Sequence, residues 1–170
     1  MTQKIVVAGA SGFVGRHLIP LLQDAGHEVL CGTRNPVLAR QTQPEKTWVH
    51  LDVNDAESLD LALEGADSLV YLVHQMQRGT ADLIEIERRS ALRVREAAEK
   101  AGLRRLVYLG GPSPEGLVSH HLEARLETGR VLRAGSISTI ELQAGMIIGV
   151  GSESWLIVRD LALRLPVMIL

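Results

Sequence analysis

The chain has 170 residues, the length of one domain or of one domain with a short appendage, and 46% of them are hydrophobic, which is enough for a sizeable core. It carries 18 Lys and Arg residues against 20 Asp and Glu residues, a net charge of −2, and only 3% of its residues are aromatic. The charge balance argues against a nucleic-acid or membrane-surface binder, and the few aromatic residues argue against a base-stacking platform.

Short segments rich in β-branched residues alternate with longer segments of helical spacing. The short segments lack a clean apolar–polar alternation, which is typical of strands buried on both faces of a parallel sheet. The predicted strands are Lys4–Ala8, Glu28–Thr33, Thr47–Leu51, Ser68–Val73, Arg105–Leu109 and Ser138–Leu142. The predicted helices are Phe13–Ala25, Asp55–Glu64, Ala81–Ala101, Ser119–Ala134 and Glu153–Arg164. This alternation predicts an α/β fold, a doubly wound parallel sheet with strand order 3-2-1-4-5-6.

Capping residues support the limits of these helices. A glycine follows each of the first four predicted helices, at the position that favours a left-handed backbone: Gly26, Gly65, Gly102 and Gly135. Asp55 precedes the second predicted helix and is expected to be its N-cap.

The strongest functional signal is a glycine-rich turn between the first predicted strand and the first predicted helix. Glycine at its first, fourth and seventh positions allows a tight turn, a close approach of a pyrophosphate and close packing of the helix on the sheet. The N-terminus of the helix adds partial positive charge. The turn comprises Gly9, Ala10, Ser11, Gly12, Phe13, Val14 and Gly15. It predicts a dinucleotide-binding Rossmann fold.

The end of the second predicted strand favours NADP(H), with NAD(H) as a possible second cofactor. An acidic residue that would bind the ribose 2′-hydroxyl of NAD is absent there, and Arg34 follows the strand instead. A guanidinium pairs well with a 2′-phosphate. Arg16, directly after the glycine turn, is a second candidate for this contact. The alternative for Arg34 is a solvated loop arginine.

Two further strand ends supply candidate contacts to the cofactor. Asp52 and Val53 follow the third predicted strand, where the Asp52 carboxylate could accept a hydrogen bond from the adenine amino group; the alternative is that Asp52 caps the next helix. Val73 and His74 come at the end of the fourth predicted strand, near the expected nicotinamide edge. The alternative for His74 is an ordinary loop histidine.

Together these residues resemble the short-chain dehydrogenase/reductase superfamily in its extended or atypical branch. The resemblance rests on the glycine turn, on Leu51-Asp52-Val53 and on Ala144–Gly149, and covers essentially the whole chain. More closely, Tyr71–His74, Val107–Pro112 and Arg164–Met168 are similar to the NmrA-like, NAD(P)H-binding nucleoside-diphosphate-sugar epimerase group. Some members of this group are regulators, so the resemblance allows both an enzyme and a cofactor sensor.

The chain departs from the catalytic pattern that the resemblance implies. The superfamily's reductases use a Tyr-x-x-x-Lys pair on the helix after the fifth strand and a serine at the end of that strand. Here the strand ends in Gly110-Gly111, and the helix offers His121 and Arg125 at the matching spacing. Residues four apart share one helical face, so we predict that His121 is the acid/base group and Arg125 its electrostatic partner. The guanidinium would keep His121 mostly neutral at pH 7. The alternative is a pair of exposed polar residues.

Other classes of site find no support in the sequence. Cys31 is the only cysteine, and His120 and His121 are adjacent and point to different faces, so we predict no disulfide and no metal site. The N-terminal apolar run Ile5–Gly9 is too short for a signal peptide or a membrane span. We therefore expect a cytoplasmic protein without a membrane span.

These observations lead to two hypotheses about function. The first is an NADP(H)-dependent oxidoreductase or epimerase-like enzyme that acts on a small carbonyl or sugar-like substrate. The second is a non-catalytic NAD(P)-binding sensor or assembly protein. In either case residues 1–150 form the cofactor-binding domain, and residues 151–170 begin a truncated or minimal substrate segment. The apolar residues of that segment lead us to expect a homo-oligomer, most simply a dimer.

Overall fold

A computed structural model of the chain describes residues 1–74, 83–113, 116 and 119–164. Its six strands form one parallel sheet with the order β3-β2-β1-β4-β5-β6, which confirms the predicted doubly wound fold. The strands are β1 (Lys4–Ala8), β2 (Glu28–Thr33), β3 (Thr47–His50), β4 (Ser68–Tyr71), β5 (Arg105–Gly110) and β6 (Thr139–Gln143). The helices are α1 (Phe13–Asp24), α2 (Pro36–Thr42), α3 (Ala56–Leu63), α4 (Leu83–Lys100), α5 (His120–Arg133) and α6 (Glu153–Arg164).

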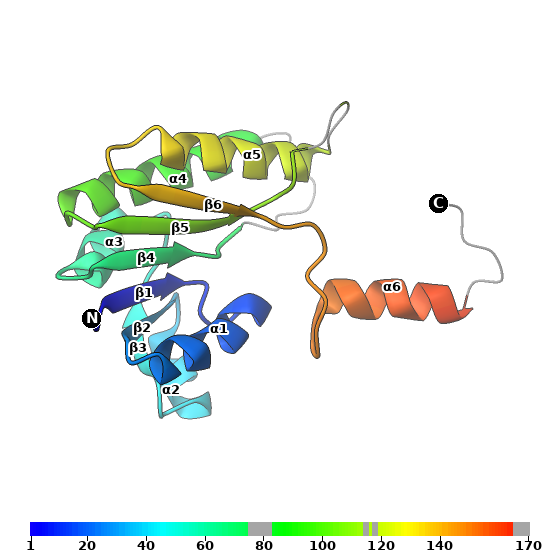
Figure 1. The fold of residues 1–170 in the computed structure, drawn as a ribbon, viewed down its shortest axis with the longest axis horizontal. Coiled ribbons are helices and arrows are strands. Elements are labelled where there is room, and N and C mark those ends of the chain that lie inside the picture. The colour runs from blue at the N-terminus through cyan, green and yellow to red at the C-terminus, as the bar shows by residue number, and fades with distance from the viewer. Residues whose placement is uncertain (75–82, 114–115, 117–118, 165–170) are drawn as a thin grey trace.

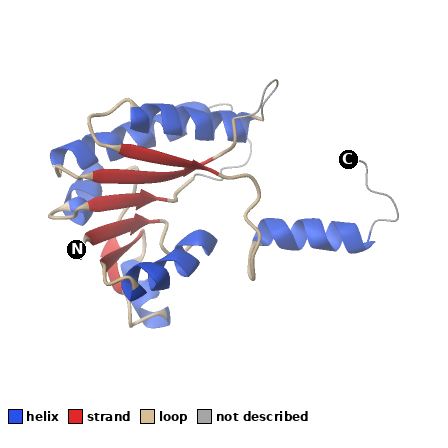
Figure 2. Cartoon of the chain, in the orientation of Figure 1, coloured by secondary structure: helices blue, strands red, loops and turns tan. Residues whose placement is uncertain are grey.

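Helices cover the sheet on two sides, as Figures 1 and 2 show, with α1 and α2 on one side and α3, α4 and α5 on the other. Alternate residues of each strand therefore enter different cores. In β1, Val6 belongs to the core under α3, α4 and α5, whereas Val7 belongs to the core under α1. Burial on both faces explains why the strands read as continuous apolar runs.

The sequence missed α2. Its local signal is present, because Asn35 is the N-cap, its side chain accepts the N–H of Leu38 at 3.1 Å, and Pro36 occupies the first turn. However, α2 has no fully buried residue, so it carries no apolar stripe that periodicity could detect. Predicted ends elsewhere differ by a few residues. Ala81, the predicted start of the longest helix, lies outside the described residues.

The predicted capping residues have the expected geometry at three helix ends. Gly26, Gly65 and Gly102 adopt φ values of +84°, +64° and +65°. Asp55 caps α3, and its side chain accepts the N–H of Glu57 at 3.1 Å. Gly135 has no positive φ, and a Cβ there would lie 2.7 Å from Arg95 and Glu99, so it allows close packing on α4.

The end of β5 lies in a crowded corner that explains its two glycines. A Cβ at Gly110 would overlap the Glu141 carboxylate of β6, which is buried and paired with Arg133. A Cβ at Gly111 would lie 2.5 Å from a methyl group of Leu122 on α5. A side chain where the superfamily's reductases place a serine would therefore have to displace Glu141 or Leu122.

Candidate functional site

The glycine turn has the geometry that its spacing predicts. Gly9 adopts φ +86°, and its carbonyl accepts the N–H of Gly12 at 3.0 Å. A Cβ at Gly15 would lie 2.6 Å from the Gly9 carbonyl oxygen, so only glycine lets α1 begin so close to β1. The first N–H groups of a helix have no partner within the helix, and such an end binds anions readily. The turn can therefore hold a phosphate group.

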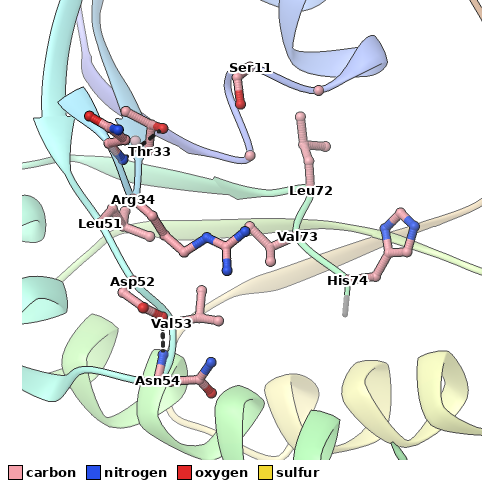
Figure 3. Close-up of a pocket in the computed structure, with 14 residues that line it drawn as sticks. Ser11, Thr33, Arg34, Leu51, Asp52, Val53, Asn54, Leu72, Val73 and His74 are labelled. Carbon is pink, nitrogen blue, oxygen red and sulfur yellow. Dashed lines mark hydrogen bonds between the residues drawn. The ribbon is translucent and has the colours of Figure 1, made fainter. Parts of the chain in front are cut away.

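A first hollow of about 720 Å³ opens beside this turn at the carboxyl ends of β1, β2 and β4 (Figure 3). It brings together most of the predicted cofactor residues. Its lining residues are Gly9, Ser11, Gly12, Gly32, Thr33, Arg34, Asn35, Leu51, Asp52, Val53, Asn54, Leu72, Val73 and His74. Ala10 is fully buried below the turn and does not line it.

Arg34 and Asp52 approach the first hollow from neighbouring strand ends. The Arg34 side chain is exposed and extends across the hollow toward Val73 (Figure 3). One Asp52 carboxylate oxygen accepts the N–H of Asn54 at 2.9 Å. Because Asp55 caps α3, the alternative that Asp52 is the cap is wrong. Asp52 is therefore held by the loop with its remaining acceptor capacity at the hollow.

A second hollow of about 460 Å³ shares Gly9, Ser11, Gly12, Leu72 and His74 with the first. The two hollows thus adjoin at the glycine turn. The remaining lining residues are Phe13, Val14, Gly15, Arg16, Leu109, Arg125, Gly145, Met146, Ile147, Gly151, Ser152 and Ser154. Arg16, the second candidate for a 2′-phosphate contact, lines this hollow and not the one with Arg34.

Arg125 is fixed at the second hollow by backbone contacts. One terminal nitrogen of the Arg125 guanidinium donates a hydrogen bond to the Leu109 carbonyl at 2.9 Å. The backbone carbonyl of Arg125 accepts a hydrogen bond from the Tyr108 hydroxyl at 3.1 Å. Gly111 lies against α5 at this point, since a Cβ there would lie 2.5 Å from a methyl group of Leu122 and at an ordinary contact distance of 3.6 Å from the Arg125 Nε. The guanidinium is thereby anchored at the carboxyl end of β5.

His74, predicted to lie near the nicotinamide edge, lines both hollows where they meet. Loss of hydration lowers the pKa of His74, and the positive charge of Arg125 lowers it further; a hydrogen bond with the backbone of Leu72 opposes this shift, and His121 adds a small lowering effect. His74 is therefore mostly neutral at pH 7. His121 is exposed and is not among the residues lining either hollow.

Tyr71 and Tyr108 lie beneath the site, with their rings 5.7 Å apart. Burial raises the pKa of both hydroxyls, most strongly that of Tyr71, and the negative charge of the buried Glu87 adds to the effect. Neither tyrosine lines a hollow. Both stay protonated, and neither replaces the superfamily's catalytic tyrosine.

The segment after β6 closes the second hollow. A Cβ at Gly149 would lie 2.9 Å from the Phe13 ring, so the backbone there packs directly against the start of α1. The Ser152 hydroxyl donates to the Ile147 carbonyl at 2.7 Å and accepts the N–H of Trp155 at 3.3 Å. These bonds hold the start of α6 beside the hollow, while the rest of α6 projects away from the sheet (Figure 1).

Sequence reasoning missed several lining residues. Five of them are sequence neighbours of predicted contacts, so their position at a strand end could have indicated that they line the site. They are Thr33, Asn35, Leu51, Asn54 and Leu72. No local pattern points to Leu109, Ser152 or Ser154, which come to the second hollow only through the packing of distant segments.

Paired hollows at the carboxyl edge of a parallel sheet, joined by a glycine turn, define a dinucleotide-binding Rossmann protein. The chain belongs to the NAD(P)H-binding family, whose sequence model matches residues 9–146. This match supports the resemblance to the short-chain dehydrogenase/reductases, and a solved protein of that superfamily from Agrobacterium tumefaciens shares the fold at 23% identity, with a TM-score of 0.68 over 82% of this chain and 48% of that chain.

Curated relatives include a ceramide reductase of Caulobacter vibrioides, 26% identical over 166 residues, which are 96% of this chain and 52% of that protein. A 3 beta-hydroxysteroid dehydrogenase/Delta 5→4-isomerase of Mycobacterium tuberculosis is 29% identical over 65% of this chain and 32% of its own length. The triphenylmethane reductase of Citrobacter sp., solved with NADP(H), matches with a TM-score of 0.71 and 24% identity over 84% of this chain and 50% of that chain. The chain thus spans about half the length of these relatives or less.

A membrane-spanning helix and a metal site of three ligands are both absent from the described residues. None of the helices there has the length and apolar character needed to span a membrane. Within the same residues no group of three His, Cys, Asp or Glu side chains is arranged to hold a metal ion.

Proposed function

We propose that the chain binds NADP(H) across both hollows, with the adenosine half in the first and the nicotinamide half in the second. The observation that carries this proposal is that the hollows adjoin at Gly9, Ser11 and Gly12. A dinucleotide has two halves joined by a pyrophosphate, and the glycine turn and the start of α1 suit that central anion.

A preference for NADP(H) over NAD(H) rests on the side chains of the first hollow. Arg34 extends across it, and Asn35 and Thr33 lie beside Arg34 at the end of β2. The guanidinium offers a charge-assisted, bidentate contact to a 2′-phosphate. Asp52, held by Asn54, is the proposed acceptor for the adenine amino group.

We propose further that the protein is an oxidoreductase or epimerase-like enzyme acting on a small carbonyl or sugar-like substrate. When bound, the nicotinamide supplies or accepts a hydride. His74, mostly neutral beside Arg125, can take the proton that a hydroxyl loses as it becomes a carbonyl, and return it in the reverse direction. Arg125 can bind an oxygen of the substrate.

His121 remains the candidate that the sequence predicted for acid/base chemistry. It lies one turn before Arg125 on α5 and acts electrostatically on His74. Because His121 lines neither hollow whereas His74 lines both, His74 is favoured for direct proton transfer, and His121 is left with an influence on the charge of His74.

Residues 151–170 are proposed to begin a substrate-binding segment. Gly151, Ser152 and Ser154 line the second hollow, and α6 then leaves the sheet. The last residues, 165–170, lie outside the described part of the chain.

A second candidate function is a non-catalytic NAD(P) sensor. It is favoured by the corner at Gly110 and Gly111, which lacks the serine of the superfamily's reductases, and by the burial of Tyr71 and Tyr108, neither of which lines a hollow. Both functions share the cofactor site and differ in turnover.

The test is a titration of the chain with NADPH and NADH by calorimetry, followed by an assay of NADPH oxidation with aldehydes, ketones and quinones. We expect NADPH to bind more tightly than NADH, and at least one carbonyl compound to be reduced. Absence of dinucleotide binding would overturn the cofactor proposal. Binding without any turnover would favour the sensor.

A further inference from the structure

The second hollow carries two positive charges. Its described lining includes Arg16 and Arg125, together with the mostly neutral His74 and serine hydroxyls, and contains no Asp or Glu. Such a lining favours negatively charged groups and disfavours neutral or cationic ones.

The two arginines approach from opposite sides. Arg16 lies one residue after the glycine turn, in the first turn of α1, and its backbone N–H bonds to Gly12. It is therefore placed to accompany the anion held by the turn. Arg125 comes from α5 and is anchored on β5 through Leu109. Among the described residues no carboxylate is paired with Arg125, so a pyrophosphate at the glycine turn would leave its charge available to a second anion.

The guanidinium of Arg125 has donors to spare. It has five N–H groups, and the described contacts give it one backbone acceptor, the Leu109 carbonyl. Its Nε is shielded from solvent and has no hydrogen-bond partner among the described residues. Since the Nε is buried and one terminal nitrogen is bonded to Leu109, an oxyanion in the hollow would meet the guanidinium at its remaining terminal N–H groups.

We propose that Arg125 binds a carboxylate of the substrate, so that the substrates are small carbonyl or hydroxy compounds bearing a carboxylate. One guanidinium beside a neutral His74 matches a single negative charge better than the dianion of a phosphate ester. The proposal rests on the proposed function, because the carboxylate is expected to bind beside a bound cofactor.

The experiment is a nuclear magnetic resonance titration of ¹⁵N-labelled protein saturated with NADP⁺. The Arg125 Nε–H signal, assigned by its absence from Arg125→Lys, is followed during addition of benzoate, of benzamide as the neutral isostere, and of phenyl phosphate. We expect a saturable shift with benzoate and about 10- to 100-fold weaker binding of benzamide, the range for one charge-assisted contact.

Two variants separate recognition from folding. Arg125→Lys keeps the positive charge but lacks the planar guanidinium that can donate two parallel hydrogen bonds. We expect it to weaken benzoate binding by about 10-fold or more. Arg130→Gln removes an exposed arginine of the same helix, paired with Glu127, and is expected to leave benzoate affinity unchanged. If Arg125→Lys does not fold, the comparison of benzoate with benzamide on the wild type decides.

Equal affinity for benzamide and benzoate would overturn the proposal, as would unchanged benzoate affinity in a folded Arg125→Lys. Tighter binding of phenyl phosphate than of benzoate would overturn the assignment to a carboxylate. If NADP⁺ itself does not bind, the proposed function fails, and the same titration of the cofactor-free protein decides the role of Arg125 separately.

Discussion

The two hollows differ in how their walls are built. The first is lined by residues within a few positions of the glycine turn or of the ends of β2, β3 and β4, and its chemistry follows the order of the chain. The second draws on α1, β5, α5 and the segment before α6, which are far apart in sequence. The lining of the first hollow, proposed to hold the cofactor's adenosine half, is therefore visible in the sequence, whereas the lining of the second hollow, the proposed reaction side, depends on how distant elements pack.

The largest expected effect is the loss of kcat when a histidine at the second hollow is replaced. His74→Ala is expected to lower kcat by about 10²- to 10⁴-fold, the range for losing a general acid/base group. His121→Ala is the matched control on α5, and we expect a much smaller loss because its side chain does not line the hollow. Steady-state kinetics of NADPH oxidation measure both. A larger loss for His121→Ala would restore the role that the sequence gave it.

The glycine turn tests the part shared by both hollows. Gly12→Val is expected to weaken NADPH binding by about 100-fold or more, because its branched side chain would occupy the space of the pyrophosphate. The fold should survive, since a Cβ at Gly12 would meet only the Gly9 carbonyl oxygen, at 3.2 Å. Gly15→Val is the contrasting variant and should lower the melting temperature strongly. Unchanged NADPH affinity in Gly12→Val would show that the turn is only structural.

Arg34 tests the first hollow. Arg34→Asp is expected to reduce the preference for NADPH over NADH by about 10- to 100-fold, because a charge-assisted contact to the 2′-phosphate is lost. NADH affinity is the internal control for the rest of the site. Arg16→Gln should change the affinities for both cofactors alike, since Arg16 lies at the second hollow. Equal affinity of the wild type for both cofactors would contradict the assignment.

The lowered pKa of His74 predicts the pH profile of the reaction side. Oxidation of an alcohol needs neutral His74, so its rate should stay level as the pH falls through 6.5 and drop only below the lowered pKa. Carbonyl reduction needs the protonated form, so its rate should rise about 10-fold for each unit of decreasing pH until that pKa is reached. Profiles measured in both directions that break above pH 7 would contradict this role.

The smallest expected effect concerns α6. Ile157, Leu161 and Leu163 are 61%, 48% and 78% exposed on a helix that leaves the sheet. Exposed apolar groups of this kind mark interfaces, so we predict that the mass measured by light scattering rises toward twice the monomer value with concentration. Leu163→Glu should reduce the rise. A constant monomer mass at high concentration would argue against a dimer.

By itself the sequence determined the order of the sheet and the glycine turn, and it predicted cofactor contacts at Arg34, Asp52, Val73 and His74, which the structure brings to the first hollow. Apolar periodicity and turn chemistry are local, and residues at the ends of adjacent parallel strands must share one edge of the sheet.

Tertiary structure alone decided the rest. The exposed helix α2 buries no full side chain, so no periodicity marks it. At the end of β5, Gly110 and Gly111 lie against the side chains of Glu141 and Leu122, which come from other elements. His121 and Arg125 share a helical face, yet only Arg125 reaches the second hollow, because the approach of α5 to Gly111 fixes the depth of each position. The spacing of residues along a helix determines which face their side chains share, whereas packing between elements determines how far each side chain lies from the site.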